Sequence, residues 1–427
     1  MKIITHNNII ETATIIKRPA QNANEDKVAS VVNILHTVKS QGDEAIKYFT
    51  KTFDKVDIEN ILLPPEILNS EANNISIDLK NAIDHAYQNI HKFHKAQISK
   101  TEIIETMEGI NCWRKNVAIQ KVGLYIPGGT APLFSTLLML AIPAIIAGCP
   151  TKILCTPPNQ LGSVHPAIAY TAKLCGITQI YLCGGAQAIA AMAYGTATIP
   201  QVHKIFGPGN QFVTIAKQLI QAQGVAIDMP AGPSEVLVIA DEYAQANFVA
   251  SDLLAQAEHG ADSQVICITN SALKANEIKT EVYKQLETLN RKEITAKALE
   301  NSCIIVVDNL NTAMQISNIY APEHLILQTQ QAETLANEVI NAGSVFIGAY
   351  TPVSVGDYAS GTNHVLPTSA YANAYSGVSV DSFVKKITYQ QLNKTGIKNI
   401  GNTVVTMAMA EGLDAHANAV LQRLNNL

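Results

Sequence analysis

The sequence is poor in charge and in aromatic residues. Asp, Glu, Lys and Arg together make up only 15% of the 427 residues, and there is a single Trp. With a net charge of −5 and no basic run, the chain lacks the electrostatic footprint of a nucleic-acid-binding protein, so no nucleic-acid partner is expected. Hydrophobic residues reach 47%, which is enough for a large core and excludes a disordered chain.

Disulfide and targeting signals are also absent. The seven cysteines form no CxxC pair, their number is odd, and several lie in apolar runs such as KILCT and IYLCGG. This usage is typical of reduced, buried thiols in a cytoplasmic protein. The first residues, MKIITHNNIIETATIIKRP, contain no signal-peptide hydrophobic region.

One long run has no charge at all, from residue 122 to residue 151. Its length alone would allow a membrane span. However, prolines and glycines at 127–132 interrupt it early, and Pro143 falls in its most apolar part. The run therefore predicts a buried strand, a glycine turn and a buried helix, with no membrane span.

The spacing of apolar residues changes twice along the chain. Residues 24–110 show amphipathic helical spacing, whereas from about 117 short β-rich runs alternate with helical ones. Such alternation predicts parallel sheets, and the number of strands suggests two of them. From about 370 the β rhythm is lost, and the segment from Ile387 to the end reads as two helices with no obvious sheet partner. Their apolar face must pack on the same chain or on a second subunit.

A first candidate site is LLAQAEHG, which reads as a helix ended by Gly260. Gln256 and His259 are three residues apart and share a helix face, whereas Glu258 points elsewhere. An amide oxygen and an imidazole on one face could bind a metal. A polar helix end with no ligand explains the same spacing.

The second candidate is the pair Glu323-His324 in YAPEHLILQ, where a loop meets a strand. Catalytic groups of α/β proteins are often found at such junctions. Histidine is the usual proton-transfer group near neutral pH, and a carboxylate beside it could activate water. A polar pair at a strand edge is the alternative.

Two further acid–histidine combinations follow. Asp357 and His364 lie in the glycine- and serine-rich segment VSVGDYASGTNHVLP, where either could be a ligand. Glu411 and His416 lie in the predicted helical tail, where an ordinary surface helix also explains them. Because zinc accepts nitrogen and oxygen ligands and usually takes four, the histidines of the C-terminal half are candidates for a zinc site.

Three glycine turns each follow an apolar strand: VGLYIPGGTAPL, QIYLCGGAQAIAA and HKIFGPGNQFV. Such turns let backbone approach a ligand at a helix N-terminus. None is GxGxxG, and about twenty residues after Gly185 stands Lys204 rather than an acid for a ribose. The motifs alone therefore indicate a dinucleotide site only weakly.

Taken together, these motifs resemble the histidinol dehydrogenase family. The resemblance runs from about residue 15 to Arg423, in the family's order, and is carried by these stretches: VGLYIPGGTAPLFSTLLMLAIPAIIAGC, GGAQAIAA, FGPGNQFV, IDMPAGPSEVLVIAD, ASDLLAQAEHGADSQV, YAPEHL, AGSVFIG and GDYASGTNHVLPT. The resemblance implies oxidation of L-histidinol through an aldehyde to L-histidine with two NAD, the last step of histidine biosynthesis. It also implies one zinc ion per site and a homodimer.

The resemblance also implies roles for individual residues. His324 would be the base and Glu323 would activate water. The implied zinc ligands are Gln256, His259, Asp357 and His416, the last from the partner subunit's tail. Substrate contacts would come from the same ligands and His324, together with Ser234, His364 and Glu411. The implied NAD contacts are Tyr125, Gln187 and Asn210, one on each glycine turn.

The expected fold is α/β, with two Rossmann-like parallel-sheet domains, a helical N-terminal region and a helical C-terminal tail. The expected division is an arm (1–22), a discontinuous first domain on the substrate and metal side (23–121 plus 235–370), a second domain on the NAD side (122–234) and a dimerising tail (371–427). Three alternatives stay open: an aldehyde step on a cysteine, with Cys149 as the nearest candidate; a zinc hydrolase that needs no NAD; and a metal-binding scaffold without catalysis.

Overall fold

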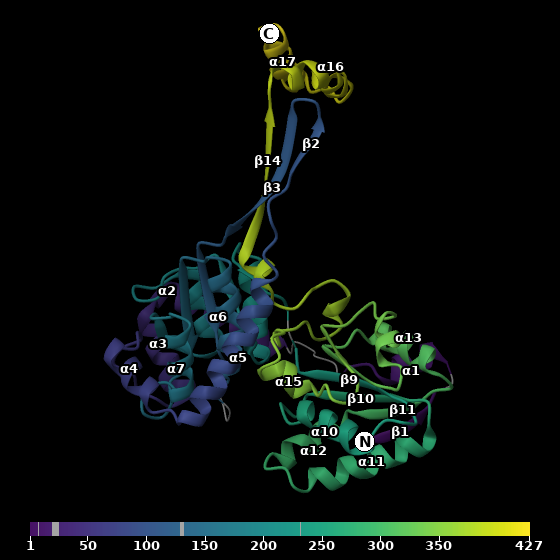
Figure 1. Cartoon of the computed structure of the whole chain (residues 1–427). Helices are drawn as coiled ribbons and strands as arrows, with labels where there is room; N and C mark the ends of the chain where they lie inside the picture. The colour runs from purple at the N-terminus through teal and green to yellow at the C-terminus, as the bar shows by residue number, and fades with distance from the viewer. Residues whose placement is uncertain (7, 19–24, 129–131, 231) are drawn as a thin grey trace.

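The computed structural model describes residues 1–427 except 7, 19–24, 129–131 and 231. Figure 1 shows two lobes side by side, from which a long, narrow sheet projects and carries two helices at its far end. Part of the predicted N-terminal arm and the second half of the first glycine turn (129–131) lie outside the described residues.

One lobe is built on a six-stranded sheet in the order β1-β11-β10-β9-β12-β13, in which every pair of neighbours is parallel. Its central strands are buried along their whole length, as expected for a parallel sheet covered on both faces. The strands are β1 (Lys2–Thr5), β9 (Glu235–Ala240), β10 (Gln264–Thr269), β11 (Cys303–Val306), β12 (His324–Gln328) and β13 (Ser344–Ile347). Their helices are α1 (Ile9–Ile15), α10 (Ala246–Ala257), α11 (Ala272–Leu286), α12 (Lys292–Glu300), α13 (Leu310–Tyr320), α14 (Ala332–Ala336) and α15 (Val353–Tyr358).

The other lobe has a five-stranded parallel sheet in the order β6-β5-β4-β7-β8. β4 comes first in the chain among the strands of this sheet but lies at its centre, so the strand order reverses between β4 and β7. In open α/β sheets, ligands bind at the carboxyl ends of the strands at such a reversal. The strands are β4 (Lys121–Tyr125), β5 (Thr151–Thr156), β6 (Ile180–Leu182), β7 (Lys204–Phe206) and β8 (Ala226–Ile227). The helices between them are α6 (Phe134–Ile146), α7 (Pro166–Leu174), α8 (Gly185–Tyr194) and α9 (Gln211–Gln221).

The N-terminal helices belong to the five-stranded lobe. Their buried side chains join one hydrophobic cluster with residues 122–229, whereas residues 236–353 form two separate clusters. The predicted grouping of 23–121 with 235–370 is therefore wrong in this respect, because helix periodicity does not say which sheet a helix covers. The helices are α2 (Glu25–Gln41), α3 (Asp43–Phe49), the π-helix η1 (Thr50–Asp54), α4 (Pro65–Asn73) and α5 (Ile77–Lys95).

The projecting element is a three-stranded antiparallel sheet, β14-β3-β2. It joins β2 (Ile103–Met107) and β3 (Ile110–Ala118) to β14 (Val384–Leu392), which follows two short 3-10 helices, η2 (Tyr371–Asn373) and η3 (Val380–Phe383). The segment from Ile387 was predicted to be helical with no sheet partner; this is wrong for residues 387–392, which belong to β14. The two helices of the tail, α16 (Lys394–Ala410) and α17 (Asp414–Leu424), are present as predicted.

The two parallel sheets and the helical tail confirm the predicted fold class. The uncharged run forms β4 and then α6, whose side chains are largely buried, and Pro143 lies inside that helix. Among the described residues, no helix is both long and apolar enough to cross a membrane.

Candidate functional site

Glu323 and His324 lie where β12 begins, at the amino end of the six-stranded sheet. His324 is the first residue of β12 and pairs in register with Val236 of β9. Before the pair, Ala321 ends α13 in the left-handed conformation (φ 50°) and Pro322 leads the chain into the strand. Both side chains are buried, with 7% of Glu323 and 3% of His324 exposed. This is not the polar strand edge that was the alternative.

Backbone atoms of Glu235 hold both members of the pair. The Glu235 N–H donates to Oε2 of Glu323 at 2.8 Å, and the Glu235 carbonyl lies 3.1 Å from Nδ1 of His324. A carbonyl only accepts, so Nδ1 carries the hydrogen in this contact. In the neutral ring Nε2 is then a free acceptor, and it is buried without a hydrogen-bond partner. In that neutral form, Nε2 is the atom of the ring that can accept a proton.

Three candidate metal ligands meet beside this imidazole. Gln256 near the end of α10 donates from Nε2 to Oδ2 of Asp357 on α15 at 3.3 Å, and Oδ1 of Asp357 lies 3.4 Å from Nε2 of His324. His259 follows α10, and its Nδ1 lies 3.2 Å from Oγ of Ser234. The structure thus brings Gln256, His259 and Asp357 together from one chain.

The chemistry of these donors fits a divalent metal. Oε1 of Gln256 is buried without a hydrogen-bond partner, which is costly unless another group satisfies it. The carboxylate of Asp357, 3.4 Å from Nε2 of His324, supplies a negative charge that a divalent cation would balance. Amide oxygen, imidazole nitrogen and carboxylate are ligands that zinc accepts, and three of them leave room for a fourth.

The charges of the site are tightly coupled. Burial acts to raise the pKa of Asp357, but His324, with His364 and His259 nearby, outweighs burial and lowers it. For His324, burial acts to lower the pKa, yet the carboxylates of Glu323 and Asp357 raise it well above its usual range. A cation bound by Asp357 would cancel part of that negative field and make His324 easier to deprotonate.

His364 connects the two lobes. Its Nδ1–H donates to the carbonyl oxygen of Asp357 at 2.6 Å, and its Nε2 lies 3.0 Å from Oγ1 of Thr136 on α6. Burial lowers the pKa of His364, against the opposing effect of Asp357. A neutral ring accepts the Thr136 hydrogen, so this contact ties the metal-ligand side to the five-stranded lobe.

The described residues where the three glycine turns begin lie together at the carboxyl edge of the five-stranded sheet. Tyr125 ends β4 and is buried, and its hydroxyl accepts the Gly185 N–H at 2.9 Å. A side chain at Gly207, after β7, would collide with the carbonyl of Tyr125, and its φ of 129° is one that glycine tolerates. Tyr125, Gly185 and Gly207 thus lie close together beside the reversal of strand order, where open α/β sheets bind ligands.

The other two predicted NAD contacts begin the helices at this edge. Gln187 is buried in the first turn of α8, and Asn210 is the exposed N-cap of α9, where its side chain accepts from the N–H groups of Phe212 and Val213. Helix N-termini attract phosphate groups through free N–H groups and the helix dipole. The predicted contacts therefore share one edge of the sheet.

Glu411 and His416 are not part of this assembly within one chain. Both are exposed on the tail, which Figure 1 shows at the far end of the projecting strands, away from α10 and α15. Across the described ranges, no group of three or more His, Cys, Asp and Glu side chains is gathered as a metal cluster. One chain thus offers three of the four predicted ligands.

Cys149 does not suit an aldehyde step. It precedes β5, at the amino edge of the five-stranded sheet, which is opposite the edge of the glycine turns. It is 2% exposed, and burial raises the pKa of its thiol to about 11. Since the thiolate is the nucleophile, this cysteine is inert near neutral pH.

Sequence reasoning did not identify Glu235 or Thr136. Glu235 opens the otherwise apolar strand EVLVIA, and a carboxylate at the start of a buried strand was a signal that could have been noticed. Thr136 gives no such signal, because its neighbour His364 is 228 residues away in the chain.

Comparisons with known proteins agree over the whole chain. A family model described as Histidinol dehydrogenase matches residues 16–424. The chain is 54% identical to "Histidinol dehydrogenase" of Bacteroides thetaiotaomicron over 427 residues, which is 100% of both chains. It is 50% identical to that of Vibrio parahaemolyticus, over 97% of this chain and 95% of the relative. The crystal structure of histidinol dehydrogenase from Elizabethkingia anophelis superposes with a TM-score of 0.97 at 50% identity, covering 100% of this chain and 98% of that one.

Proposed function

The chain belongs to the histidinol dehydrogenase family, and we propose that it catalyses the zinc-dependent, four-electron oxidation of L-histidinol through L-histidinal to L-histidine with two NAD. This is the final step of histidine biosynthesis, and we place the enzyme in the cytoplasm. The observation that carries the proposal is the buried pair Glu323-His324, whose free Nε2 lies 3.4 Å from a carboxylate of the ligand set.

The zinc ligands in this proposal are Gln256, His259 and Asp357 of one subunit and the partner subunit's His416. The buried amide oxygen of Gln256, which has no hydrogen-bond partner, supports this set. Bound zinc would act as a Lewis acid that holds the substrate's imidazole and amine and so fixes the direction of its alcohol. Ser234, His364 and Glu411 complete the substrate contacts, with Glu411 also coming from the partner.

His324 and Glu323 carry the proton transfers. Nε2 of His324 accepts the hydroxyl proton as the alcohol carbon loses hydride. Glu323 then takes a proton from water as the water oxygen adds to the aldehyde carbon, and the protonated His324 returns its proton to the aldehyde oxygen, which gives the hydrate and leaves His324 neutral. His324 acts a second time as the hydrate is oxidised to the acid. NAD supplies the hydride acceptor, at the cradle of Tyr125, Gln187 and Asn210.

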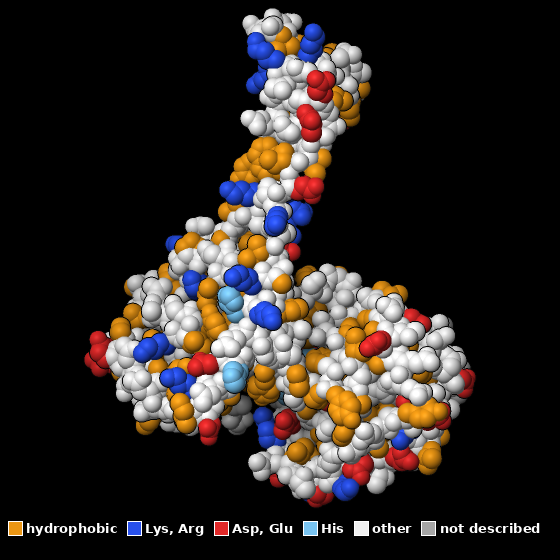
Figure 2. Space-filling model, viewed as in Figure 1, with side chains coloured by type: hydrophobic (Ala, Val, Ile, Leu, Met, Phe, Trp, Pro, Cys, Tyr) orange, Lys and Arg blue, Asp and Glu red, His pale blue; other side chains and the backbone are white. Residues whose placement is uncertain are grey.

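The position of the tail supports a homodimer in this proposal. Figure 2 shows hydrophobic side chains gathered on the projecting strands, and the tail adds more. Exposed apolar side chains of this region include Ile103, Ile104, Tyr389, Met407, Met409 and Leu413. A surface of this kind is typical of an interface with a second copy. Across such an interface, Glu411 and His416 can reach the ligands that their own chain leaves incomplete.

The two roles in the pair are separable by mutation. We expect His324→Gln to slow both oxidations, with an overall loss of about 100- to 10,000-fold in kcat. Glu323→Gln should impair the second oxidation more than the first, because it removes the base that activates water. The measurement is the NADH formed per site in a single turnover with L-histidinol and, separately, with L-histidinal.

Glu258→Gln is the matched control, because it changes the glutamate of the other Glu-His pair, which lies outside the ligand set. It should keep wild-type turnover. Wild-type rates for His324→Gln and Glu323→Gln would rule out the proposed roles.

A further inference from the structure

A charged pair next to the site has no part in the chemistry above. Glu235, the first residue of β9, is only 2% exposed, and its carboxylate pairs with Arg18, which follows α1. The two residues are 217 positions apart. A buried carboxylate is costly unless it is well paired, and an apolar side chain would serve the strand at least as well. The pair therefore calls for a reason other than strand formation.

The two side chains form a bidentate, charge-assisted contact, which is the strongest type of ion pair in proteins. Nε of Arg18 donates to Oε1 of Glu235 at 2.5 Å, and Nη2 donates to Oε2 at 2.7 Å. The Ser369 N–H donates to Oε1 at 2.9 Å. Ser369 and Ala370 both have positive φ, at 56° and 63°, a conformation that non-glycine residues keep only when their surroundings enforce it. The fork of Arg18 fixes the carboxylate in a way that a lysine could not.

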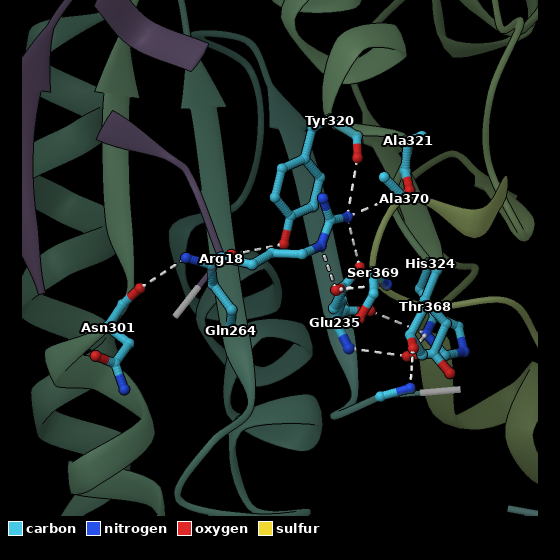
Figure 3. Close-up of polar contacts among 12 residues, drawn as sticks. Arg18, Glu235, Gln264, Asn301, Tyr320, Ala321, His324, Thr368, Ser369 and Ala370 are labelled. Atoms are coloured by element: carbon cyan, nitrogen blue, oxygen red, sulfur yellow. Dashed lines mark hydrogen bonds and ion pairs between the residues drawn. The ribbon is translucent and has the colours of Figure 1, made fainter. Parts of the chain in front are cut away.

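Arg18 also holds the chain that leads to the catalytic pair. Its Nη2 donates to the carbonyl oxygen of Tyr320 at 2.9 Å, and its guanidinium lies 3.9 Å from the centre of the Tyr320 ring. The Tyr320 hydroxyl donates to Gln264 at 2.8 Å, and Gln264 donates to the Asn301 carbonyl at 3.1 Å. Figure 3 shows Arg18 between the Tyr320 carbonyl on one side and Glu235 on the other. Only two residues lie between Tyr320 and Glu323 in the chain.

The contacts of Arg18 with Glu235 and with Tyr320 both act on the segment that carries Glu323 and His324. The backbone of Glu235 donates to Glu323 and accepts from His324, while its side chain is held by Arg18. We propose that Arg18 and Glu235 are positioning residues, which align the start of β9 with the start of β12 so that the Glu235 backbone fixes the Glu323 carboxylate and the His324 tautomer. The inference rests on the roles proposed above for Glu323 and His324.

The test is a double-mutant comparison. Arg18→Lys keeps the charge but loses the fork, so kcat of the zinc-loaded enzyme should fall about 10- to 100-fold, as a small misplacement of a catalytic group does. KM for L-histidinol and for NAD should change less than about threefold, because neither is bound by the pair. In a His324→Gln background, the same Arg18→Lys change should cost less than about twofold in kcat, because the group it positions is already gone.

Glu235→Gln is a second variant, isosteric with the native side chain, and should repeat the pattern. Ile278→Val, in the buried core of the same lobe, is the control for a simple loss of stability and should leave kcat of the folded enzyme unchanged. A crystal structure of Arg18→Lys should show Glu323 displaced from the Glu235 N–H.

Two outcomes would overturn the inference. One is an equal loss in both backgrounds, which would mean that Arg18 supports the lobe in general. The other is an unchanged kcat for Arg18→Lys and Glu235→Gln with the Glu323 contact intact. Failure of the proposed function looks different: His324→Gln alone would then leave turnover intact, whatever Arg18 does.

Discussion

Two of the buried polar atoms that lack a hydrogen-bond partner lie together at the site. Oε1 of Gln256 and Nε2 of His324 have no hydrogen-bond partner, although both residues are nearly inaccessible. Buried polar atoms in proteins are almost always paired, so two unpaired ones next to the same carboxylate, Asp357, point to a ligand. Helix spacing distinguishes Glu258 from His259, because only the histidine shares a helix face with Gln256.

At the residue scale, the sequence indicated the candidate site residues but not the residues that hold them in place. The spacing of Gln256 and His259 and the junction at Glu323-His324 were local and could be read directly. The sequence did not show that His94 would be fully buried and hydrogen-bonded to the Ile90 carbonyl and Asn363. The Arg18–Glu235 pair was also missed, because its partners meet only in the folded chain.

A buried acid outside the site gives a pH-dependent prediction. Asp252 on α10 is 3% exposed and accepts hydrogen bonds from Gln328 and the Val353 N–H, and burial raises its pKa to about 6. The fold therefore favours the protonated acid. Its contribution to stability is complete below the unfolded pKa of about 4 and is lost as the pH rises through about 6.

We expect Asp252→Asn to remove this loss because an amide does not titrate, and its oxygen can still accept from Nε2 of Gln328. The free energy of unfolding of the variant, relative to wild type, should rise by about 1 kcal/mol between about pH 5 and about pH 8. Urea unfolding of both proteins at the two pH values measures it. A difference that does not change with pH would contradict the assigned cause.

At the element scale, the predictable strands were those with a buried face. Most strands of the two parallel sheets are apolar runs and were recognised, whereas the edge strands β1 and β8 and the strands β2, β3 and β14 were not. Every residue of β2 is exposed, and β14 has only one residue that is even half-buried. Without a buried face there is no alternation to detect, so β14 read as part of a helix.

The junction between the projecting strands and the tail gives a prediction at this scale. Gly396 in the first turn of α16 packs directly on the β2–β3 turn, and any side chain there would collide with the Gly109 carbonyl. Gly396→Ala should loosen the docking of α16, so that amide hydrogen exchange in α16 and α17 accelerates about tenfold or more while the lobes stay unchanged. Thr395→Ala, at the exposed neighbouring position, should exchange like wild type. Equal exchange in the two variants would contradict this account.

At the scale of the whole molecule, opposite edges of two sheets meet. Glu323 and His324 lie at the amino edge of the six-stranded sheet, whereas the glycine turns lie at the carboxyl edge of the five-stranded sheet. His364 and Thr136 join the two sides. This relation could not be predicted from strand patterns, since periodicity within a strand carries no information about how two sheets face each other.

The position of the tail predicts that sites are shared between subunits. In a mixed dimer of His416→Ala and Glu323→Gln chains, one site has both defects and the other has neither. Random mixing after unfolding and refolding should therefore restore about a quarter of wild-type activity, since half of the dimers are mixed and each has one intact site of two. Activity no higher than that of either variant alone would show that each site is built from one chain.

The most direct test of the whole account is the number of NADH molecules formed per L-histidinol consumed, before and after removal of metal with a chelator and again after zinc is restored. The account predicts two NADH, with turnover lost on metal removal and regained with zinc. One NADH with release of the aldehyde would contradict the role of Glu323. Turnover that persists without metal would contradict the ligand set, and hydrolysis of an amide or ester without NAD would favour a zinc hydrolase instead.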